Sequence, residues 1–592
     1  MPQAETGSGI DIYLKKILSA SLAEIAAKEG KTLPDDGKMS QALEIERPKR
    51  EGQGDRATSA GLQLSKAFDL SPRDLASKIT VALEDKKGGL IDKIEVAGPG
   101  FINFFLSDEW LSNVIREVLS EGDRYGASDA GLGRRVQVEF VSANPTGPLH
   151  IGHGRGAAVG DTLANLLSFA GWKVEREYYI NDAGLQMEIL GRSTQSRYFE
   201  LQGKPELAPF PENAYKGDYI YDIAKGAITE EGDKFLSMPL DESLPWFKKY
   251  AAGVILGTIK ADLEDFGVRF DVWFSESTLY ERALVPQAME YLKRRGHTFE
   301  FEGALWFKTS DFADSPAAEN SDKNAQQTEE EKDRVLIRGN GVPTYFASDI
   351  AYHKEKFDRG FERVIDIWGA DHHGYVPRMK AGIEAIGRDP DDFDVMLIQF
   401  VNLVRDGVQV PMSTRSGQFV TLRDVLDEVG VDATRYFFLM RRHDSQLDFD
   451  LELAKRAGND NPVYYVQYAH ARISSILREA KNQGKTLSEG RVCDISPSVF
   501  AEAQGGAEAR KLVDCLAFFP KDMAGAAKDL TPHAVTVYAT NLAGAFHSFY
   551  NTNRILGSDS DLEASRLTLA LSAKIVLARC LALIGVSTPD KM

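Results

Sequence analysis

The sequence predicts an α/β chain in three parts: a small N-terminal α/β domain, a central domain built on a parallel sheet, and a C-terminal all-α helical bundle. Val136–Val141 is a short β-branched and aromatic run, and Ala157–Phe169 follows it with apolar residues at helical spacing. Lys173–Ile180 then completes a β–α–β unit, whose two strands must run parallel. From Asn459 onward the periodicity is helical.

Length and charge limit the function classes. A chain of 592 residues has room for about three domains. The formal net charge of −18 argues against a simple electrostatic nucleic-acid binder but permits a local basic face. Residues 461–592 carry 14 Lys/Arg and 12 Asp/Glu, whereas the rest carry 56 and 76. The helical bundle is therefore free of the acidic excess, which permits RNA binding there.

The cysteines and the N-terminus indicate a cytoplasmic protein. Cys493, Cys515 and Cys580 are too few and too widely spaced for a disulfide framework or a zinc motif, which favours a reducing compartment. The N-terminal MPQAETGSGIDIYLKK lacks the apolar core of a signal peptide, and no apolar run is long enough to span a bilayer. We therefore expect no membrane partner.

The N-terminal domain is expected over residues 1–122. Ile10–Ala27 has the pattern of an amphipathic helix, and Ile91–Leu106 predicts two strands around the Gly98-Pro99-Gly100 turn. Patterning alone assigns this domain the role of a scaffold without a site of its own.

The stretch PTGPLHIGHGRGAAVGD lies between the first central strand and its helix. Gly152, Gly154 and Gly156 stand where the helix should begin, and glycines there let phosphates approach backbone N–H groups at the positive helix end. His150 and His153 can donate hydrogen bonds to these phosphates, where charge develops during nucleotidyl transfer. The pattern indicates an ATP site for adenylation.

Two other interpretations of this stretch stay open. Histidines near glycines are often only polar residues of a turn. Gly152-x-Gly154-x-x-Ala157, followed by Glu175, is also close to a dinucleotide-binding pattern, although ten residues separate its first glycine from the strand. A dehydrogenase is therefore the alternative enzyme class.

At this point the sequence resembles a known family. HIGH at positions 150–153, after SANPTGPL, resembles the first signature of class I aminoacyl-tRNA synthetases, and the longer EFVSANPTGPLHIGHGR resembles arginyl-tRNA synthetases in particular. The resemblance covers nearly the whole chain. It implies a class I Rossmann-type catalytic domain over 123–455, with an insertion at about 191–300, and an α-helical anticodon-binding domain over 456–592.

The resemblance also implies an activity. This would be an arginine–tRNA ligase whose partners are L-arginine, ATP accompanied by Mg²⁺, and tRNA(Arg), acting as a monomer without a tightly bound metal. In the family, activation of arginine waits for bound tRNA. The family's N-terminal module touches the corner of the tRNA. Its usual GD-aromatic-ATN string is Gly54-Asp55-Arg56-Ala57-Thr58-Ser59 here, which departs from the family pattern at Arg56 and Ser59.

The central chain continues with further predicted elements. Residues Gly191–Trp246 lose periodicity and contain five prolines, as expected of an irregular insertion, whereas Tyr250–Phe266 and Tyr280–Arg295 are predicted helices. Ala313–Asp333 is polar and is interpreted as a mobile loop. Arg334–Arg338 is predicted to open the second half of the parallel sheet.

Tyr345 and Asp349 are four residues apart, so one helical face can present both. A carboxylate beside a ring offers a guanidinium an ion pair and a stacking surface. Without context, an ordinary surface acid and a core tyrosine is the simpler explanation. The resemblance implies that this pair holds the arginine side chain, and that Ser142 and Asn144 hold the polar end of the amino acid, with His153 beside it.

The strand Val364–Trp368 ends in Gly-Ala-Asp-His-His-Gly. Ligands of such sheets gather beyond the carboxyl ends of the strands, so Asp371 and His372 are expected to face the ribose of ATP or the substrate. A zinc site is the alternative for this cluster. The resemblance implies no metal there.

The segment Pro411–Gly417 (PMSTRSG) resembles the second class I signature, KMSKS, with Met412 and Ser413 matching it. Such a loop stabilises charge over the ATP phosphates as pyrophosphate leaves. Its two lysine positions hold Pro411 and Thr414, and the position before HIGH where some relatives have a lysine holds Gly147. We expect Arg415 to supply the missing cation, ahead of Arg405 and Arg155.

Aromatic and basic residues recur twice in the C-terminal part. The residues concerned are Tyr464, Tyr468, Arg472, Phe549, Tyr550 and Arg554. Rings beside arginine suit unstacked RNA bases, although a tyrosine-rich bundle core is the alternative. The resemblance implies that this region contacts tRNA. Two other function classes stay open: a class I synthetase for another amino acid, and an RNA-binding paralogue without catalysis.

Overall fold

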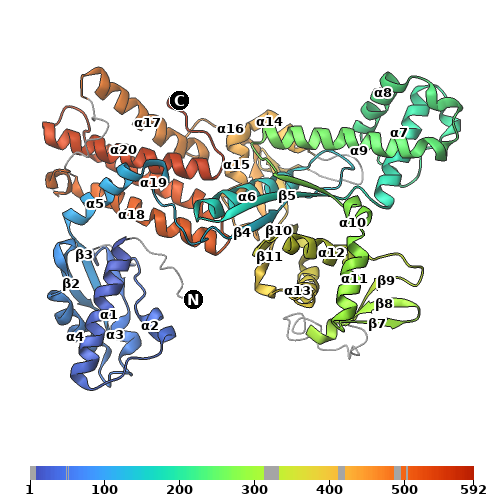
Figure 1. The fold of residues 1–592 in the computed structure, drawn as a ribbon. Coiled ribbons are helices and arrows are strands. Elements are labelled where there is room, and N and C mark those ends of the chain that lie inside the picture. The colour runs from blue at the N-terminus through green and yellow to red at the C-terminus, as the bar shows by residue number, and fades with distance from the viewer. Residues whose placement is uncertain are drawn as a thin grey trace.

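The computed structural model describes residues 9–48, 50, 52–312, 333–410, 420–485, 495–501 and 505–592. Figure 1 shows a central parallel sheet with the N-terminal domain and the C-terminal helices on one side of it. A helical insertion, α7–α9, extends from the opposite side. The predicted fold class is confirmed.

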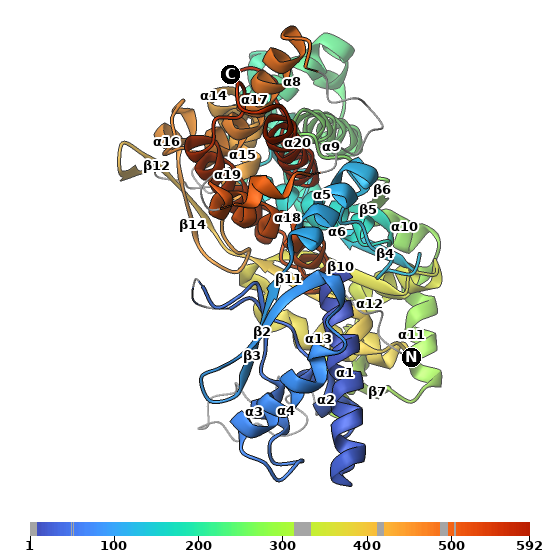
Figure 2. The same cartoon turned by 90° about the vertical axis from the view of Figure 1, so that its left-hand side faces the viewer.

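The N-terminal domain is a helix-covered antiparallel sheet of order β1-β3-β2. Its elements are α1 (Gly9–Glu29), α2 (Asp36–Ala42), β1 (Arg56–Thr58), α3 (Ala60–Leu64), α4 (Pro72–Glu84), β2 (Ile91–Ala97) and β3 (Phe101–Leu106). The predicted helix and the two strands around the glycine turn are present. Gly98 and Gly100 have φ of 52° and 147° there, which other residues rarely adopt. Helix α5 (Asp108–Glu121) then leads the chain to the bundle, below which the domain lies (Figure 2).

The central sheet has the order β11-β10-β4-β5-β6, and all its strands are parallel. The strands are β4 (Arg135–Glu139), β5 (Lys173–Ile180), β6 (Val272–Ser275), β10 (Arg363–Gly369) and β11 (Phe393–Ile398). The chain order reverses between β4 and β10, so ligands of this doubly wound sheet are expected beyond the carboxyl ends of those two strands.

Two predictions about this sheet are wrong. Strand β6 belongs to the central sheet, although its four residues lie in the segment interpreted as insertion. Strand β9 (Arg334–Ile337) does not open the second half of the sheet. It pairs instead in a separate antiparallel sheet with β7 (Thr298–Phe301) and β8 (Ala304–Phe307). Short apolar runs show that a strand exists, but its pairing partners depend on distant segments.

Three helices accompany the sheet: α6 (Ile151–Phe169), α12 (Tyr345–Asp358) and α13 (Val376–Ala385). Helix α6 begins at Ile151, with His150 as its N-cap, so Gly152 and Gly154 lie inside its first turn rather than before it. Gly160 of the same helix faces Phe140 so closely that an added Cβ would lie 2.2 Å from the ring. This glycine therefore lets the helix pack against the end of β4.

The insertion is helical, contrary to the expectation of irregular chain. Its helices are α7 (Leu185–Leu201), α8 (Tyr219–Glu231) and α9 (Leu240–Asp265), and they pack around the buried rings of Tyr198, Phe199, Phe235 and Phe247. Helix α9 contains Pro245 near its start. The insertion has its own small core, so apolar residues face several directions and no single stripe is evident in the sequence. Helices α10 (Ser277–Glu281) and α11 (Leu284–Arg294) follow β6.

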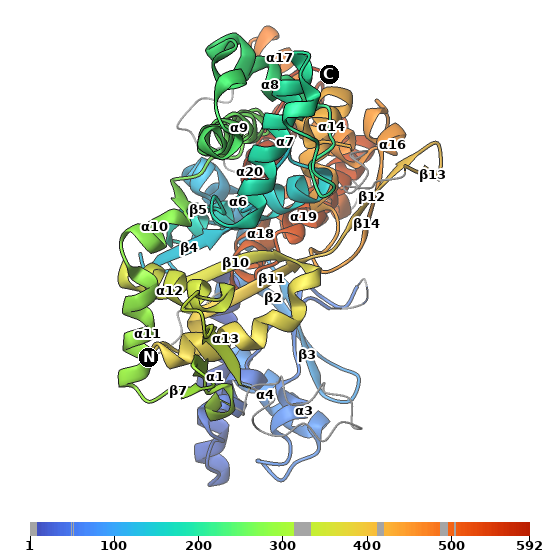
Figure 3. The ribbon, with the colours of Figure 1, turned by 90° about the vertical axis from the view of Figure 1, so that its right-hand side faces the viewer.

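A connecting region joins the sheet to the bundle. It contains β12 (Val401–Arg405), β13 (Val408–Gln409), α14 (Leu422–Val429), α15 (Val431–Leu439), β14 (Leu447–Asp450) and α16 (Leu451–Lys455), and its β12–β13 hairpin protrudes in Figure 3. The helix predicted over Asp424–Met440 is two helices, because Gly430 adopts φ of 82° between them.

The bundle consists of α17 (Pro462–Asn482), α18 (Gly506–Lys528), α19 (His533–Thr552) and α20 (Ser560–Leu583), as predicted. Arg435 of α15 is fully buried where the bundle meets the central domain. It donates to the Ile584 carbonyl at 2.6 Å and to Asp161 of α6 at 2.6 Å. Within the described residues, no helix combines the length and apolarity that a membrane crossing requires.

Candidate active site

Two stacked imidazoles form the N-terminal end of α6. The His150 Nδ1 atom accepts hydrogen bonds from the backbone N–H groups of Gly152 at 3.1 Å and His153 at 3.4 Å. The His150 N–H in turn donates to His153 Nδ1 at 3.3 Å, and the ring centroids lie 3.6 Å apart. The pair thus closes a capping box in which histidines replace the usual Ser/Thr and Glu.

The hydrogen bonds determine the tautomer of both rings. Burial lowers the pKa of His150, and burial together with the neighbouring His150 lowers the pKa of His153 well below its usual value. Both rings are therefore neutral at pH 7, and because each Nδ1 accepts, each Nε2 carries the proton. The helix start thus offers two imidazole N–H donors beside its own partial positive charge, an arrangement suited to phosphate oxygens.

The turn between β4 and the imidazoles has a strained backbone. Val141 and Ser142 adopt φ of 67° and 39°, a region that a β-branched residue such as valine rarely enters. The Ser142 hydroxyl donates to Glu139 Oε1 at 2.9 Å and accepts from the Tyr179 N–H at 3.1 Å. Its proton is therefore committed to holding this turn. The Asn144 side-chain amide, two residues on, donates to Gln186 of α7 at 2.7 Å, and its side-chain carbonyl oxygen accepts no hydrogen bond from another described residue.

The described chain that follows the predicted second signature lies against the start of α6. Thr421 pairs with His150 as an isolated antiparallel bridge, and the Leu422 N–H donates to the Leu149 carbonyl at 2.7 Å. Residues 411–419 lie outside the described residues, and so do the predicted positions Met412, Ser413 and Arg415.

The other two arginines considered for the phosphates are engaged elsewhere. Arg155 is fully buried and donates to three backbone carbonyls, those of Gln399, Ser445 and Arg442, at 2.7–2.9 Å. Burial lowers its pKa to about 10. Arg405 pairs with Glu428 at 2.7 Å. Arg155 therefore braces the connecting region, and it cannot reach a phosphate from this position.

Asp349 lies on α12, half-buried, and accepts a hydrogen bond from the Tyr375 hydroxyl. Burial raises the pKa of its carboxyl group. Tyr345 lies one turn earlier on the same helix and is 69% exposed, so its ring is free to cover a ligand. The two predicted side chains therefore occupy neighbouring positions at the start of α12.

A second carboxyl group, which the sequence did not point to, joins Asp349. Burial raises the pKa of Glu276 to about 7, and the negative charges of Asp349 and Asp182 add to the effect. The Asn181 amide donates to Glu276 Oε2 at 2.8 Å, while Asp182 accepts from the Ser275 hydroxyl at 2.5 Å. None of the three carboxylates forms an ion pair with a lysine or arginine in the described part of the chain. They form a concentration of negative charge suited to a cationic ligand.

The residues that the sequence analysis missed lie at the carboxyl ends of sheet strands, where ligands of such sheets bind. Asn181 and Asp182 come directly after β5, and Glu276 comes directly after β6, at the carboxyl edge of the sheet where ligands bind. Recognising Val272–Ser275 as a sheet strand would have drawn attention to Glu276.

The imidazole pair and the carboxylates of Asp182, Glu276 and Asp349 lie at this same edge of the sheet. Tyr179, near the end of β5, contacts the turn that precedes the imidazoles, because its backbone N–H donates to the Ser142 hydroxyl. Burial and the charges of Glu276 and Asp349 raise the pKa of the Tyr179 hydroxyl. The predicted Asp371 and His372 lie in the short 3₁₀ helix η8 (Ala370–Tyr375) after β10 and are exposed. The same segment supplies Tyr375 to Asp349.

No metal site accompanies these side chains in the part of the chain that the structure describes. There, no group of three or more His, Cys, Asp or Glu side chains is arranged to hold an ion.

Four of the predicted RNA-contacting residues form one cluster on α17 and α19. Tyr464 and Tyr468 stack with ring centroids 5.8 Å apart. The Arg472 guanidinium lies 4.5 Å from the Tyr468 ring and 4.7 Å from the Tyr550 ring, and it donates to the Tyr468 hydroxyl at 2.7 Å. All four side chains are half-buried, so ring faces and a cation are presented together.

The remaining two predicted residues differ. Phe549 is fully buried and belongs to the bundle core, because its position on α19 faces the other helices. Arg554 is exposed beyond the end of α19 and donates to the Leu556 carbonyl at 3.0 Å.

Arg56, in the N-terminal string matched to the family, is also buried. It pairs with Asp11 at 3.1 Å and with Asp514 of α18 at 2.8 Å, and its guanidinium lies 4.0 Å from the Phe518 ring. Its role is to join the N-terminal domain to the bundle, so it is unavailable to RNA.

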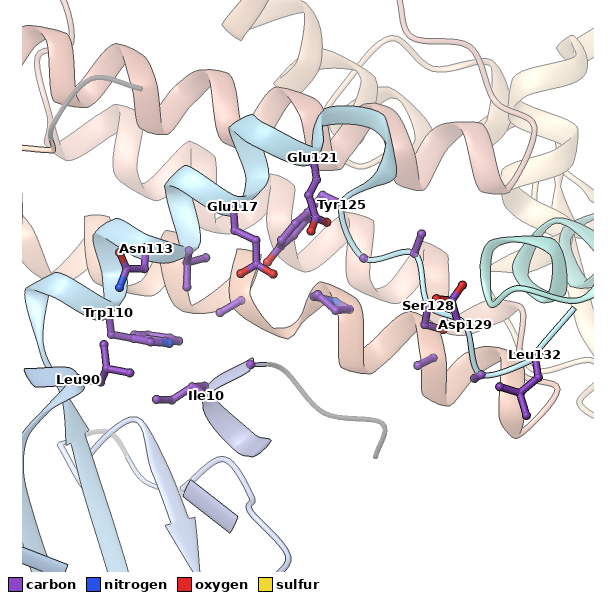
Figure 4. A pocket seen from close by; sticks show the side chains of 18 residues that line it. Ile10, Leu90, Trp110, Asn113, Glu117, Glu121, Tyr125, Ser128, Asp129 and Leu132 are labelled. Atoms are coloured by element: carbon purple, nitrogen blue, oxygen red, sulfur yellow. The ribbon is translucent and has the colours of Figure 1, made fainter. Parts of the chain in front are cut away.

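A pocket of about 490 Å³ lies at the same junction, away from the predicted site. Figure 4 shows Trp110, Glu117, Glu121 and Tyr125 around it, on α5 and the segment that follows. None of the predicted catalytic or substrate-binding residues lines this pocket, and we assign it no function.

Three family models match consecutive parts of the chain. The arginyl-tRNA synthetase N-terminal domain matches residues 13–106, the class I (R) tRNA synthetase catalytic domain matches 114–455, and the DALR anticodon-binding domain matches 466–592.

Individual relatives match over nearly the full length. An arginine–tRNA ligase from Geobacter sp. (strain M21) is 50% identical over 93% of this chain and 95% of the relative. One from Syntrophotalea carbinolica is 49% identical over 98% of this chain and 99% of the relative. The solved arginyl-tRNA synthetase of Thermus thermophilus shares the fold with a TM-score of 0.70, at 23% identity over 98% of this chain and 100% of that one.

Proposed function

The chain belongs to the arginine–tRNA ligase family of class I synthetases, and from that premise we propose which of its residues carry the reaction. The enzyme uses ATP to activate L-arginine as an adenylate and then transfers the arginyl group to the terminal ribose of tRNA(Arg). The dehydrogenase alternative is thereby excluded.

The observation that carries the residue assignment is that Asp182, Glu276 and Asp349 lie close together and form no ion pair with a lysine or arginine among the described residues. Asp349 and Glu276 would bind the guanidinium of arginine, because a planar cation with several N–H donors satisfies two carboxylates at once. Tyr345, exposed one turn from Asp349, would stack on the guanidinium plane. The carbonyl of Asn144 would take the α-amino group, and the strained turn at Ser142 would hold Asn144 in place.

The imidazole pair would bind ATP. The Nε2–H groups of His150 and His153 would donate to phosphate oxygens, and the first turn of α6 at Gly152 would add backbone N–H groups. Both donors are positioned before reaction, so they stabilise the charge that develops as the arginine carboxylate attacks the α-phosphate and pyrophosphate leaves. His153 would also border the arginine carboxylate.

We further propose that Asp371 and His372 contact the ribose or the substrate, and that Met412, Ser413 and Arg415 complete the phosphate site. Mg²⁺ would arrive with ATP, bound by the phosphates rather than by a protein cage. The exclusion of Arg155 leaves Arg415 as the foremost replacement for the missing signature lysines.

For tRNA, the cluster of Tyr464, Tyr468, Arg472 and Tyr550 would stack unpaired anticodon bases, and Arg554 would contact the phosphate backbone. The chain would act as a cytoplasmic monomer with domains at 1–122, 123–455 and 456–592.

A charging assay with all twenty amino acids and total tRNA tests these assignments. Arginine alone should be attached, and ATP–pyrophosphate exchange with arginine should be slow until tRNA is added. Charging with another amino acid would overturn the assignment of Asp349 and Glu276, and full exchange without tRNA would contradict tRNA-dependent activation.

A further inference from the structure

A network of buried charges lies behind the arginine site. Lys356 of α12 is fully buried, and its ammonium group bonds Glu139 of β4 at 2.5 Å and Asp366 of β10 at 2.9 Å. Three elements that are distant in the sequence are thus tied together at one nitrogen atom.

One branch of the network leads to the β4 turn. Glu139 uses one carboxylate oxygen for Lys356 and the other for the Ser142 hydroxyl, at 2.9 Å. This contact holds the backbone of Ser142 at its positive φ. The position of Asn144, two residues further on, therefore depends on Glu139 and through it on Lys356.

The other branch leads back to the guanidinium-binding carboxylate. Asp366 bonds His353 Nε2 at 2.9 Å, and His353 Nδ1 lies 2.8 Å from the backbone carbonyl of Asp349. Lys356 follows Asp349 by seven residues, which is two helical turns or about 10 Å along the axis of α12. The network therefore fixes the position of α12 and of Asp349 on it.

Two further side chains, Tyr352 of α12 and its C-cap residue Arg359, anchor the same helix. The Tyr352 hydroxyl bonds Glu139 at 2.9 Å and Glu177 of β5 at 2.5 Å, and Arg359 bonds Glu177 at 2.6 Å. Charged side chains in such a place stabilise a fold less than well-packed apolar ones would, because each ion must lose its hydration. What they provide is a defined geometry, since each hydrogen bond specifies both distance and direction.

We propose that Lys356 is a positioning residue that sets the distance between the two ends of the arginine site. One end is the Asp349–Glu276 acidic group and the other is the Ser142–Asn144 turn, so the inference rests on the proposed placement of arginine between them. A fixed distance selects amino acids by side-chain length. It therefore excludes guanidino acids that are one methylene shorter or longer than arginine.

The test compares three guanidino acids in the charging reaction: arginine, homoarginine with one more methylene, and norarginine with one fewer. The quantity measured is kcat/KM for arginine divided by kcat/KM for each analogue. This ratio does not depend on the fraction of active enzyme, so a loss of folded protein leaves it unchanged. A difference of one methylene is typically discriminated about 10–200-fold.

In Lys356→Met, the ratio of kcat/KM for arginine to kcat/KM for the analogue should fall at least about tenfold for one or both analogues. The KM for ATP should stay within about twofold of the wild-type value. Lys354→Met is the matched control, because Lys354 lies on the same helix but pairs with Asp358 at the exposed side, at 2.7 Å. It should keep the wild-type ratio. An unchanged ratio in Lys356→Met, with only kcat or yield reduced, would overturn the proposal.

If Lys356→Met does not fold, Tyr352→Phe is the second variant for the same measurement, because it removes one hydroxyl group and no charge. Its ratio should fall in the same direction by a smaller factor, and a wild-type ratio would likewise count against the inference. If instead the proposed binding of arginine by Asp349 is wrong, a different result is expected: Asp349→Asn would use arginine as well as the wild type does.

Discussion

The replacement of Asp349 by asparagine tests the arginine site most directly. Asparagine has nearly the same volume as aspartate, and its carbonyl oxygen can still accept the Tyr375 hydroxyl. The substitution therefore removes one negative charge with little change in shape. Glu276 remains as the second carboxylate of the proposed guanidinium site.

The expected magnitude follows from burial. Two unit charges 4 Å apart interact by about 4 kcal/mol at an effective dielectric constant of about 20. Removing one partner of a buried ion pair costs about 3–5 kcal/mol. Because Glu276 retains part of the attraction, we expect the lower end of this range, which corresponds to about a 10²–10³-fold loss in kcat/KM for arginine.

The assay is aminoacylation of tRNA with labelled arginine, at varied arginine and at varied ATP. The KM for ATP should stay within about twofold, since the imidazole pair is untouched. Asp358→Asn is the matched control: it makes the same change on the same helix, at a side chain that is 61% exposed, and should behave as wild type. A loss below tenfold, or an equal rise in the KM for ATP, would refute the reasoning.

Three further predictions follow from single contacts. Arg435→Met should lower the free energy of unfolding by about 3 kcal/mol, because buried Asp161 loses its shortest ion pair and keeps Arg176 at 3.3 Å and the Asn165 amide at 3.4 Å. Arg435→Met combined with Asp161→Leu should recover most of this loss in urea unfolding, and equal losses in the two variants would argue against the explanation. Burial raises the pKa of Glu276 to about 7, so the free enzyme holds a proton on this carboxyl at lower pH, and the KM for arginine should rise as the pH falls through 7. Glu276→Gln should remove this pH dependence of KM, and parallel pH profiles for the variant and the wild type would contradict the prediction. Tyr468→Ala should weaken tRNA binding about 5–100-fold in a filter-binding assay, which is the cost of losing one base stack, and should leave the KM for arginine unchanged. Wild-type affinity for tRNA would show that Tyr468 does not contact the RNA.

The local parts of the site could be predicted because they depend on neighbours in the chain. His150 and His153 are three residues apart at a helix start, so their stacking follows from helical geometry once the helix is recognised. Tyr345 and Asp349 are four apart on α12, and the same periodicity brings them to one face.

Burial of individual polar side chains could not be predicted in this way. Arg155 was one of the lower-ranked candidates for the missing phosphate-binding cation. It is buried instead and donates to three backbone carbonyls of a segment far along the chain. Phe549 was predicted to contact RNA but lies in the bundle core, and Arg56 of the N-terminal string is likewise buried. In each case the direction of the side chain depends on which distant element packs against its helix or strand.

The amino-acid sequence by itself determined the fold class, the order of the principal helices and strands, and the family to which the chain belongs, because periodicity and motif spacing are properties of contiguous residues. The tertiary structure alone decided that Asp182, Glu276 and Asp349 meet, and that Lys356 ties β4, β10 and α12 together. These groups come from segments that lie far apart in the chain, and parallel strand pairing brings those segments to one edge of the sheet.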